Sequence, residues 1–202
     1  MNYLAIDTSG KNLTVVIEKD GQIYKYFDSE CGVNHSVALM PKIEEMALKA
    51  NFDFKSADFF CAVVGAGSFT GIRIGVATIK AMCFAFNKPC LSITSFDTLS
   101  YNKKGEKVLA VIDAKHNGYY ACGYENNAVV LPPCYIDGQK LSELLLEFKG
   151  VSFCEINGFS IEVVDVCDGL INAINSKLDK VSSDVESLSP LYVRKSQAEE
   201  GR

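Results

Sequence analysis

The feature that most constrains the fold is a glycine-rich stretch, GAGSFTGIRIG, at residues 65–75. An uninterrupted apolar run at 59–64 precedes it and predicts a buried, parallel strand, and a helical pattern follows it to about Phe86. A strand, a glycine turn and a helix in this order are typical of a phosphate-binding loop. The spacing fits neither common form. Gly71 comes one position too late for G-x-G-x-x-G, and no Lys-Ser or Lys-Thr pair follows the glycines.

The helix after these glycines is apolar around most of its circumference. Ser68 or Thr70 is suited to cap its N-terminus. Gly71 and Gly75 fall on one face, which predicts the close approach of another backbone. The helix is either fully internal or covers its own sheet on one side and contacts a partner chain on the other. We favour the partner, because one helix layer on a sheet normally keeps a wet face.

The first hundred residues predict the element order βββαβαβ. Alternating runs at 3–6, 13–18 and 23–27 predict three antiparallel strands, with a hairpin turn at Asp20-Gly21. A helix is predicted from Asn34 or Ser36 to Ala50. The strand at 59–64, the glycine helix and a fifth strand at 90–94 complete this part of the chain.

The segments beyond residue 100 are shorter. A polar run at 101–107 is the candidate domain boundary. Strands are predicted at 108–113 and 119–124, joined by a hairpin turn at His116-Asn117-Gly118. The remaining predicted elements are a helix at 141–148, strands at 151–154 and 161–166, and a helix at 170–178.

Charge and composition limit the classes of partner. The formal net charge is −5 and the pI about 5.1, and no Lys/Arg-rich block offers a nucleic-acid surface. If the protein serves RNA, we expect it to do so through a partner. The start MNYLAIDTSG lacks the features of a signal peptide, and the apolar runs at 59–67 and 128–136 are too short to span a bilayer. These features predict a cytoplasmic protein with no membrane partner.

Cysteines and histidines give little support for a metal site. The eight cysteines form no C-x-x-C pair, so we interpret them as reduced thiols rather than zinc ligands or disulfides. The two histidines, His35 and His116, are far apart in sequence and form no H-x-x-x-H motif. No metal site is therefore predicted, and His35 is more consistent with a helix start or an interface than with a ligand.

Five segments in order resemble the bacterial TsaB family of tRNA threonylcarbamoyladenosine biosynthesis proteins. They are DTS at 7–9, NHS at 34–36, the glycine stretch at 65–75, VIDAK at 111–115 and PLYVR at 190–194. The resemblance implies an α/β fold of two ribonuclease-H-like domains of the actin, hexokinase and Hsp70 superfamily, each a mixed sheet with flanking helices. On this basis, residues 1–102 form the partner-binding domain, which the tail 190–202 could complete, and 103–189 form a smaller α/β domain.

The same resemblance implies a function without catalysis. Family members are similar to the transferase TsaD, which modifies the adenosine beside the tRNA anticodon. They pair with it as scaffold and activator, recruit the ATPase TsaE and reach tRNA only indirectly. Ser95 and Leu99 stand where the transferase has its histidine pair. No cofactor of the chain's own is implied, with ATP or ADP only at a partner interface. The alternative is a degenerate ATP-binding or glycopeptidase-like protein acting as a homodimer; self-association is also expected of the scaffold when it is alone.

Candidate site residues follow from the helix patterns and the family pairing mode. The predicted partner interface consists of His35, Leu39, Ile43, Gly71, Ile72, Gly75, Val76, Thr78, Ile79 and Met82. Asp7, Thr8 and Ser9 resemble a degenerate first phosphate loop of the superfamily, with Asp113 as the counterpart in the second domain. A short polar turn explains these four residues equally simply and is the interpretation that we favour.

Overall fold

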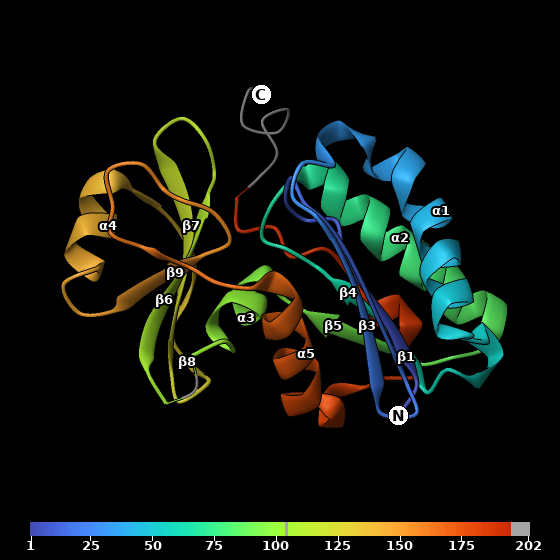
Figure 1. The fold of residues 1–202 in the computed structure, drawn as a ribbon. Coiled ribbons are helices and arrows are strands. Elements are labelled where there is room, and N and C mark those ends of the chain that lie inside the picture. The colour runs from blue at the N-terminus through green and yellow to red at the C-terminus, as the bar shows by residue number, and fades with distance from the viewer. Residues whose placement is uncertain (104, 195–202) are drawn as a thin grey trace. The chain divides into compact units, whose positions relative to one another are not determined.

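The computed structural model describes residues 1–103 and 105–194, without the side chain of Val33. The described chain forms two compact units. Unit 1 comprises Met1–Thr94 and Ile174–Leu191, and unit 2 comprises Ser95–Ala173 and the segment that starts at Tyr192 (Figure 1). Each unit is built on one five-stranded mixed sheet.

The sheet of unit 1 has the strand order β3-β2-β1-β4-β5. Its strands are β1 (Tyr3–Asp7), β2 (Leu13–Lys19), β3 (Gln22–Asp28), β4 (Phe59–Val63) and β5 (Cys90–Ile93). The first three form an antiparallel meander, and β4 and β5 continue the sheet parallel to β1. Every residue of β1 and β4 is buried, as expected of central strands in a sheet covered on both faces.

Two long helices cover one face of this sheet. The helix α1 (His35–Ala50) and the helix α2 (Phe69–Phe86) contact one another. Their buried side chains form a single core with alternate residues of the strands, such as Leu4, Ile6 and Phe60. The prediction of βββαβαβ for the first part of the chain is confirmed.

A later segment of the chain returns to complete unit 1. Ser182 exchanges two backbone hydrogen bonds with Cys90 on the edge strand β5. Val185 and Leu188 join the core, and the N–H of Leu191 donates to the carbonyl of Val64 at 2.7 Å. This corrects the predicted role of the tail, because residues 174–191 complete unit 1, whereas 192–194 belong to unit 2 and 195–202 lie outside the described residues.

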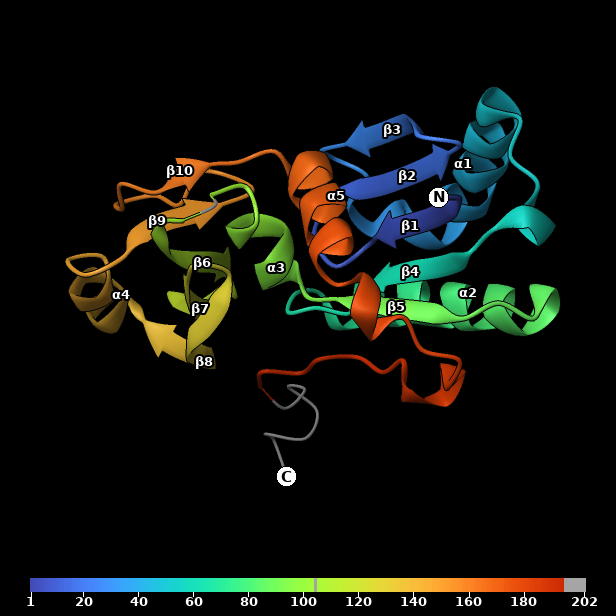
Figure 2. The same ribbon diagram turned by 90° about the horizontal axis from the view of Figure 1, so that it is seen from below.

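Unit 2 repeats the strand order of unit 1. Its strands are β6 (Lys107–Asp113), β7 (Gly118–Glu125), β8 (Ala128–Asp137), β9 (Lys149–Ser152) and β10 (Glu162–Val163). The order β10-β9-β6-β7-β8 again places an antiparallel meander beside two parallel strands. Both strand orders can be followed in Figure 2. The predicted fold of two ribonuclease-H-like sheets is confirmed.

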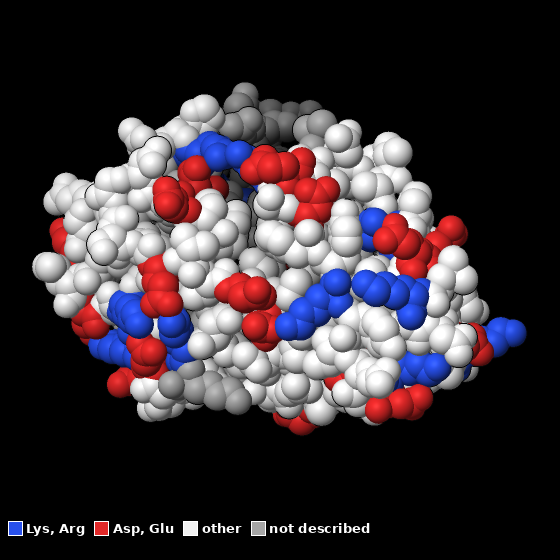
Figure 3. All heavy atoms as spheres, in the orientation of Figure 1, with Lys and Arg blue, Asp and Glu red and all other residues white. Residues whose placement is uncertain are grey.

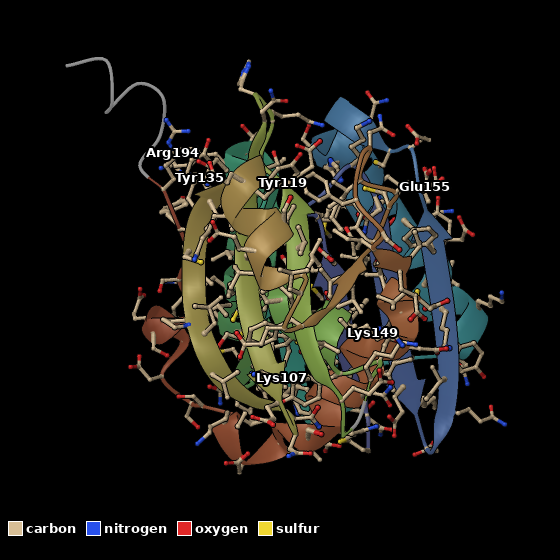
Figure 4. The ribbon with its side chains drawn as sticks, turned by 90° about the vertical axis from the view of Figure 1, so that its left-hand side faces the viewer. Lys107, Tyr119, Tyr135, Lys149, Glu155 and Arg194 are labelled. Carbon is tan, nitrogen blue, oxygen red and sulfur yellow. The ribbon has the colours of Figure 1, made fainter. Side chains whose placement is uncertain are left out.

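The helices of unit 2 are short. They are α3 (Ser95–Ser100), α4 (Gly138–Leu144) and α5 (Val166–Ser176), the last of which crosses the unit boundary. The side-chain amide of Asn102 donates to the carbonyls of Thr98 and Asp165 and so joins α3 to the start of α5. Near the end of the described chain, the guanidinium of Arg194 lies 4.7 Å from the ring centroid of Tyr135 (Figure 4).

Two elements of unit 2 were not predicted from the sequence, and the boundary between the units lies earlier in the chain than predicted. The strand β8 contains two consecutive prolines, Pro132-Pro133, which lie on the edge of the sheet where no ladder hydrogen bond is required of them. The helix α3 is too short to show a helical period. Because α3 packs on β6, unit 2 begins at Ser95 rather than at residue 103. Within the part of the chain that the structure describes, four short 3-10 turns lie at Gly32–Asn34, Phe54–Ser56, Leu178–Lys180 and Val185–Ser187.

Candidate partner interface

The glycine stretch forms a tight turn between β4 and α2. Gly65 and Gly67 have φ values of +108° and +152°, which side-chain-bearing residues rarely adopt. A Cβ at Gly67 would lie 2.1 Å from the carbonyl oxygen of Ser9, and the N–H of Ser68 donates to that same oxygen. Ser68 also caps α2, because its hydroxyl accepts from the N–H of Gly71. The predicted turn and cap are confirmed.

Gly71 and Gly75 do permit a close backbone approach, but its partner is the chain's own loop after β1. A Cβ at Gly71 would lie 2.0 Å from the carbonyl oxygen of Thr8, and one at Gly75 would lie 2.6 Å from the Thr8 hydroxyl oxygen. That hydroxyl donates to the carbonyl of Gly71 at 2.7 Å. The prediction that these glycines contact a partner helix is therefore wrong.

Most of the other predicted interface residues are also committed to the core of unit 1. The periodic apolar stripe of each helix faces the sheet, where its burial stabilises the fold. Thr78 is half-buried, whereas the rest are at most 7% exposed. The residues packed in the core are Leu39, Ile43, Ile72, Val76, Ile79 and Met82.

His35 begins α1, as one of the two interpretations of this residue predicted. Its side chain is 4% exposed, and its Nε2 lies 2.9 Å from the carbonyl oxygen of Asn12. Since a carbonyl only accepts, Nε2 carries the proton in this contact. His35 thus fixes the start of α1 to the loop between β1 and β2.

The loop after β1 is closed and buried. Asp7, Thr8 and Ser9 are at most 4% exposed, and a carboxylate oxygen of Asp7 accepts from the N–H of Ser9 at 2.7 Å. Burial raises the pKa of Asp7, and the hydrogen bonds from Ser9 and the charge of His35 oppose that rise. Thr8 and Ser9 use their polar groups to hold α2, as the favoured interpretation of a structural turn requires.

Asp113 occupies the equivalent position in unit 2, at the end of the first strand of its sheet. Its carboxylate accepts from the N–H of Lys115 at 2.7 Å, the same arrangement as at Asp7. Here the carboxylate is exposed and pairs with the Lys115 ammonium at 2.9 Å. Three successive residues of this hairpin, Lys115, His116 and Asn117, have positive φ.

The surface left available by α1 and α2 is their outward face. On α1 it carries Val37, Met40 and Leu48, which are 74%, 46% and 82% exposed. On α2 it carries Ala77, Ala81 and Phe84, of which Phe84 is 61% exposed. We call these six residues the outward face; the sequence analysis missed them. The signal was present, since they recur at helical spacing between the buried positions.

The charged side chains beside the α2 part of the outward face are engaged nearby, whereas on α1 the exposed Glu44 lies between Met40 and Leu48. The guanidinium of Arg73 lies over the ring of Phe69, 3.9 Å from its centroid. Lys80 pairs with Glu186 in the returning segment at 3.1 Å. Elsewhere, acidic and basic side chains alternate over the face of the molecule shown in Figure 3. A helix pair whose exposed side chains are largely apolar, with few charges among them, is typical of a protein–protein contact.

A cleft of about 450 Å³ lies where α2 ends beside the returning segment of unit 1. Its lining includes Phe84 and Lys88 from the α2 end and Asp184 and Glu186 from the return. Among the described residues, no group of three or more His, Cys, Asp or Glu side chains could hold a metal ion. None of the eight cysteines, all of which lie among the described residues, is in a disulfide, and Cys154 is exposed.

The helix α2 is long and apolar enough to cross a membrane by length and composition. A core helix meets the same criterion, and one side of α2 packs on β4. The apolar composition of α2 is therefore explained by its place in unit 1.

Comparison with known proteins identifies the family. The model described as "TsaD: tRNA N6-adenosine threonylcarbamoyltransferase" matches residues 29–150, more than half of the chain. The chain belongs to this family. Several of its curated relatives are TsaB proteins, so the resemblance inferred from the motifs is confirmed.

The matches to these relatives are partial in length. The tRNA threonylcarbamoyladenosine biosynthesis protein TsaB of Escherichia coli (strain K12) is 26% identical over 131 residues, 63% of this chain and 56% of the relative. The TsaB of Bacillus subtilis (strain 168) is 26% identical over 127 residues, 62% of this chain and 56% of the relative. The chain thus aligns with little more than half the length of these relatives.

Solved structures share the whole fold. A Pseudomonas aeruginosa protein described as similar to the peptidase YEAZ superposes with a TM-score of 0.79 at 20% identity, covering 96% of this chain and 99% of its own. The structure described as YeaZ from the same organism gives 0.76 at 18% identity, with 95% and 99% covered. At these identities the likeness is one of fold.

Proposed function

We propose that this chain is a non-catalytic scaffold and activator in tRNA threonylcarbamoyladenosine synthesis, and that it pairs with a TsaD-type transferase through the outward face of α1 and α2. The outward face is the observation that carries the proposal. Two adjacent helices of unit 1 expose large apolar side chains, including Val37, Leu48 and Phe84. Burying them against a partner removes this apolar surface from water.

The family favours a TsaD-type subunit as the occupant of this face. The matched model describes the transferase itself, and the curated relatives carry the name of its biosynthetic system. A subunit of the same fold presents helices in equivalent positions, so a helix-to-helix pairing would bury both outward faces at once. A second copy of this chain offers the same complement, and we expect self-association when the transferase is absent.

The remaining parts of the proposal concern activity and further partners. We propose that a TsaE-type ATPase binds the assembled pair, that tRNA is contacted through the transferase, and that the complex is cytoplasmic. Nucleotide would bind only at the partner interface. The buried loop at Asp7 supports this, since Thr8 and Ser9 bind α2 through their hydroxyl and carbonyl groups.

The test places a charge on the outward face. Phe84→Asp would bury a carboxylate among apolar side chains of the partner, so we expect the dissociation constant for TsaD from the same genome to rise at least tenfold, about 1.4 kcal/mol. Titration calorimetry measures the affinity, and transfer of the threonylcarbamoyl group to tRNA by TsaD, with and without this chain, measures activation.

The matched control is Leu146→Asp in unit 2, where Leu146 is 91% exposed and lies outside the outward face. It should bind and activate as the unchanged protein does. Normal affinity of folded Phe84→Asp would show that the surface is assigned wrongly. Transfer by the chain without TsaD would contradict the non-catalytic role.

A further inference from the structure

The contact between Thr8 and the two helical glycines holds α2 against the loop after β1. The Thr8 side chain is completely buried and lies in the groove that Gly71 and Gly75 leave open on α2. Its hydroxyl donates to the carbonyl of Gly71 at 2.7 Å, and the same oxygen occupies the space beside Gly75. Loop and helix therefore interlock through one side chain.

This contact fixes the height and register of α2 on its sheet. The groove faces inward, whereas the outward face of the same helix carries Ala77, Ala81 and Phe84. Any group that enlarges the contents of the groove must push the helix away from the loop, because protein interiors are close-packed. A displacement of α2 would move its outward face relative to that of α1, and a two-helix contact requires both to be in place.

We infer that Thr8 is a positioning residue for partner binding, and that it acts by locking α2 through the Gly71–Gly75 groove. The inference rests on the proposed function, because it assumes that the outward face is the docking surface. The inference goes beyond the proposed function, because it assigns an effect on partner affinity to a residue that cannot touch the partner. It also gives the Gly-x-x-x-Gly spacing a role inside the chain.

The two glycines differ in a way that makes the lock testable. A Cβ at Gly75 would lie 2.6 Å from the Thr8 hydroxyl oxygen but 3.9 Å from the Thr8 Cβ and from Ile6. Removing the hydroxyl in Thr8→Ala therefore opens the space that Gly75→Ala needs. A Cβ at Gly71 would lie 2.0 Å from the backbone oxygen of Thr8, and no side-chain change at position 8 relieves that collision.

The experiment is a double-mutant comparison of affinity for TsaD, with thermal unfolding measured in parallel. We expect Gly75→Ala to weaken binding at least tenfold and Thr8→Ala to weaken it by less. The double variant Thr8→Ala/Gly75→Ala should return to within threefold of Thr8→Ala. Gly71→Ala should not be rescued by Thr8→Ala. If Gly75→Ala does not fold, the lock is tested by the two double variants alone. Thr8→Ala/Gly75→Ala should then fold and bind, whereas Thr8→Ala/Gly71→Ala should not.

Other results would overturn the lock. Folded Gly75→Ala with normal affinity would contradict it, as would equal affinities of Gly75→Ala and the double variant. Thr8→Ser retains the hydroxyl and should retain affinity, which separates the lock from a general loss of packing. Phe84→Asp tests the outward face alone. Normal binding of that variant together with rescue at Gly75 would contradict the proposed docking surface, whereas lost binding without rescue would contradict only the lock.

Discussion

The two units share one strand order but connect their fourth and fifth strands differently. In unit 1 the connection contains the 18-residue helix α2, whereas in unit 2 the residues between β9 and β10 form an irregular loop. Ile156 and Phe159 of that loop pack in the core of unit 2, on the ring of Tyr119 among others. The same sheet can thus be covered by a helix or by a few side chains. Only the helix adds a long outward face.

The glycines of the two connections differ in the same way. Gly67 stands in the turn before α2, where a Cβ would meet the Ser9 backbone, whereas Gly158 in the loop of unit 2 has φ +85° and nothing within 4 Å of a Cβ. At Gly67 the turn before α2 touches the backbone of the loop after β1, whereas at Gly158 the loop of unit 2 makes no such contact.

The largest expected effect sharpens this contrast. Gly67→Ala combines an unfavourable φ with a backbone collision and should lower the free energy of unfolding by at least about 3 kcal/mol. At Gly158 only the unfavourable φ applies, so Gly158→Ala should lower the free energy of unfolding by about 1 kcal/mol. Thermal unfolding followed by circular dichroism measures both, and similar losses would break the comparison.

A second prediction concerns the cores beneath the two connections. Ile79 on α2 is fully buried, and Ile156 in the loop is 7% exposed. We expect Ile79→Ala to cost about 3–4 kcal/mol, because a packed helix cannot collapse into the cavity, and Ile156→Ala about 2 kcal/mol, because a loop relaxes more readily. Urea unfolding of each variant gives the values. A larger loss at Ile156 would mean that the loop is as rigid as the helix.

Sequence reasoning predicted the strands and helices of unit 1 because their periods were long and their caps clear. Ser68 and the Asp20-Gly21 hairpin turn are examples, and both are confirmed. It was less successful in unit 2, where α3 is too short to establish a period and β8 contains two prolines.

The sequence predicted which helices form the candidate site, but not which of their faces is exposed. The spacing of Gly71 and Gly75 predicts a close approach, yet it does not say whether the neighbour is a partner or a loop more than sixty residues earlier in the chain. Only the tertiary structure identifies Thr8 as the neighbour of these two glycines. The most regular apolar stripe was assigned to a partner, although a helix first buries that stripe on its own sheet.

The smallest expected effect compares the two equivalent aspartates. Burial raises the pKa of Asp7, so the folded state holds the proton more tightly than the unfolded chain, whose pKa is about 3.9. The free energy of unfolding should therefore fall as pH rises from about 4 through the raised pKa, and this loss is complete above it. Asp7→Asn removes that component while its amide oxygen can still accept from Ser9.

Chemical unfolding at a series of pH values tests this prediction. The stability of Asp7→Asn relative to the unchanged protein should increase with pH over that range and then level off. Asp113→Asn, which alters an exposed carboxylate in the equivalent turn, is the control and should give no such trend. A pH-independent difference for Asp7→Asn would show that its carboxylate is not strained by burial.

The return of residues 174–191 to unit 1 has a consequence for synthesis on the ribosome. The bridge between Cys90 and Ser182 and the bond from Leu191 to Val64 can form only after residues 95–173 of unit 2 have been translated. Unit 1 therefore remains incomplete, with the edge of β5 uncovered, while these residues are being translated. Residues 95–173 of unit 2 form one contiguous segment that contains all five strands of its sheet, so this sheet can form before the segment that completes unit 1 has been translated.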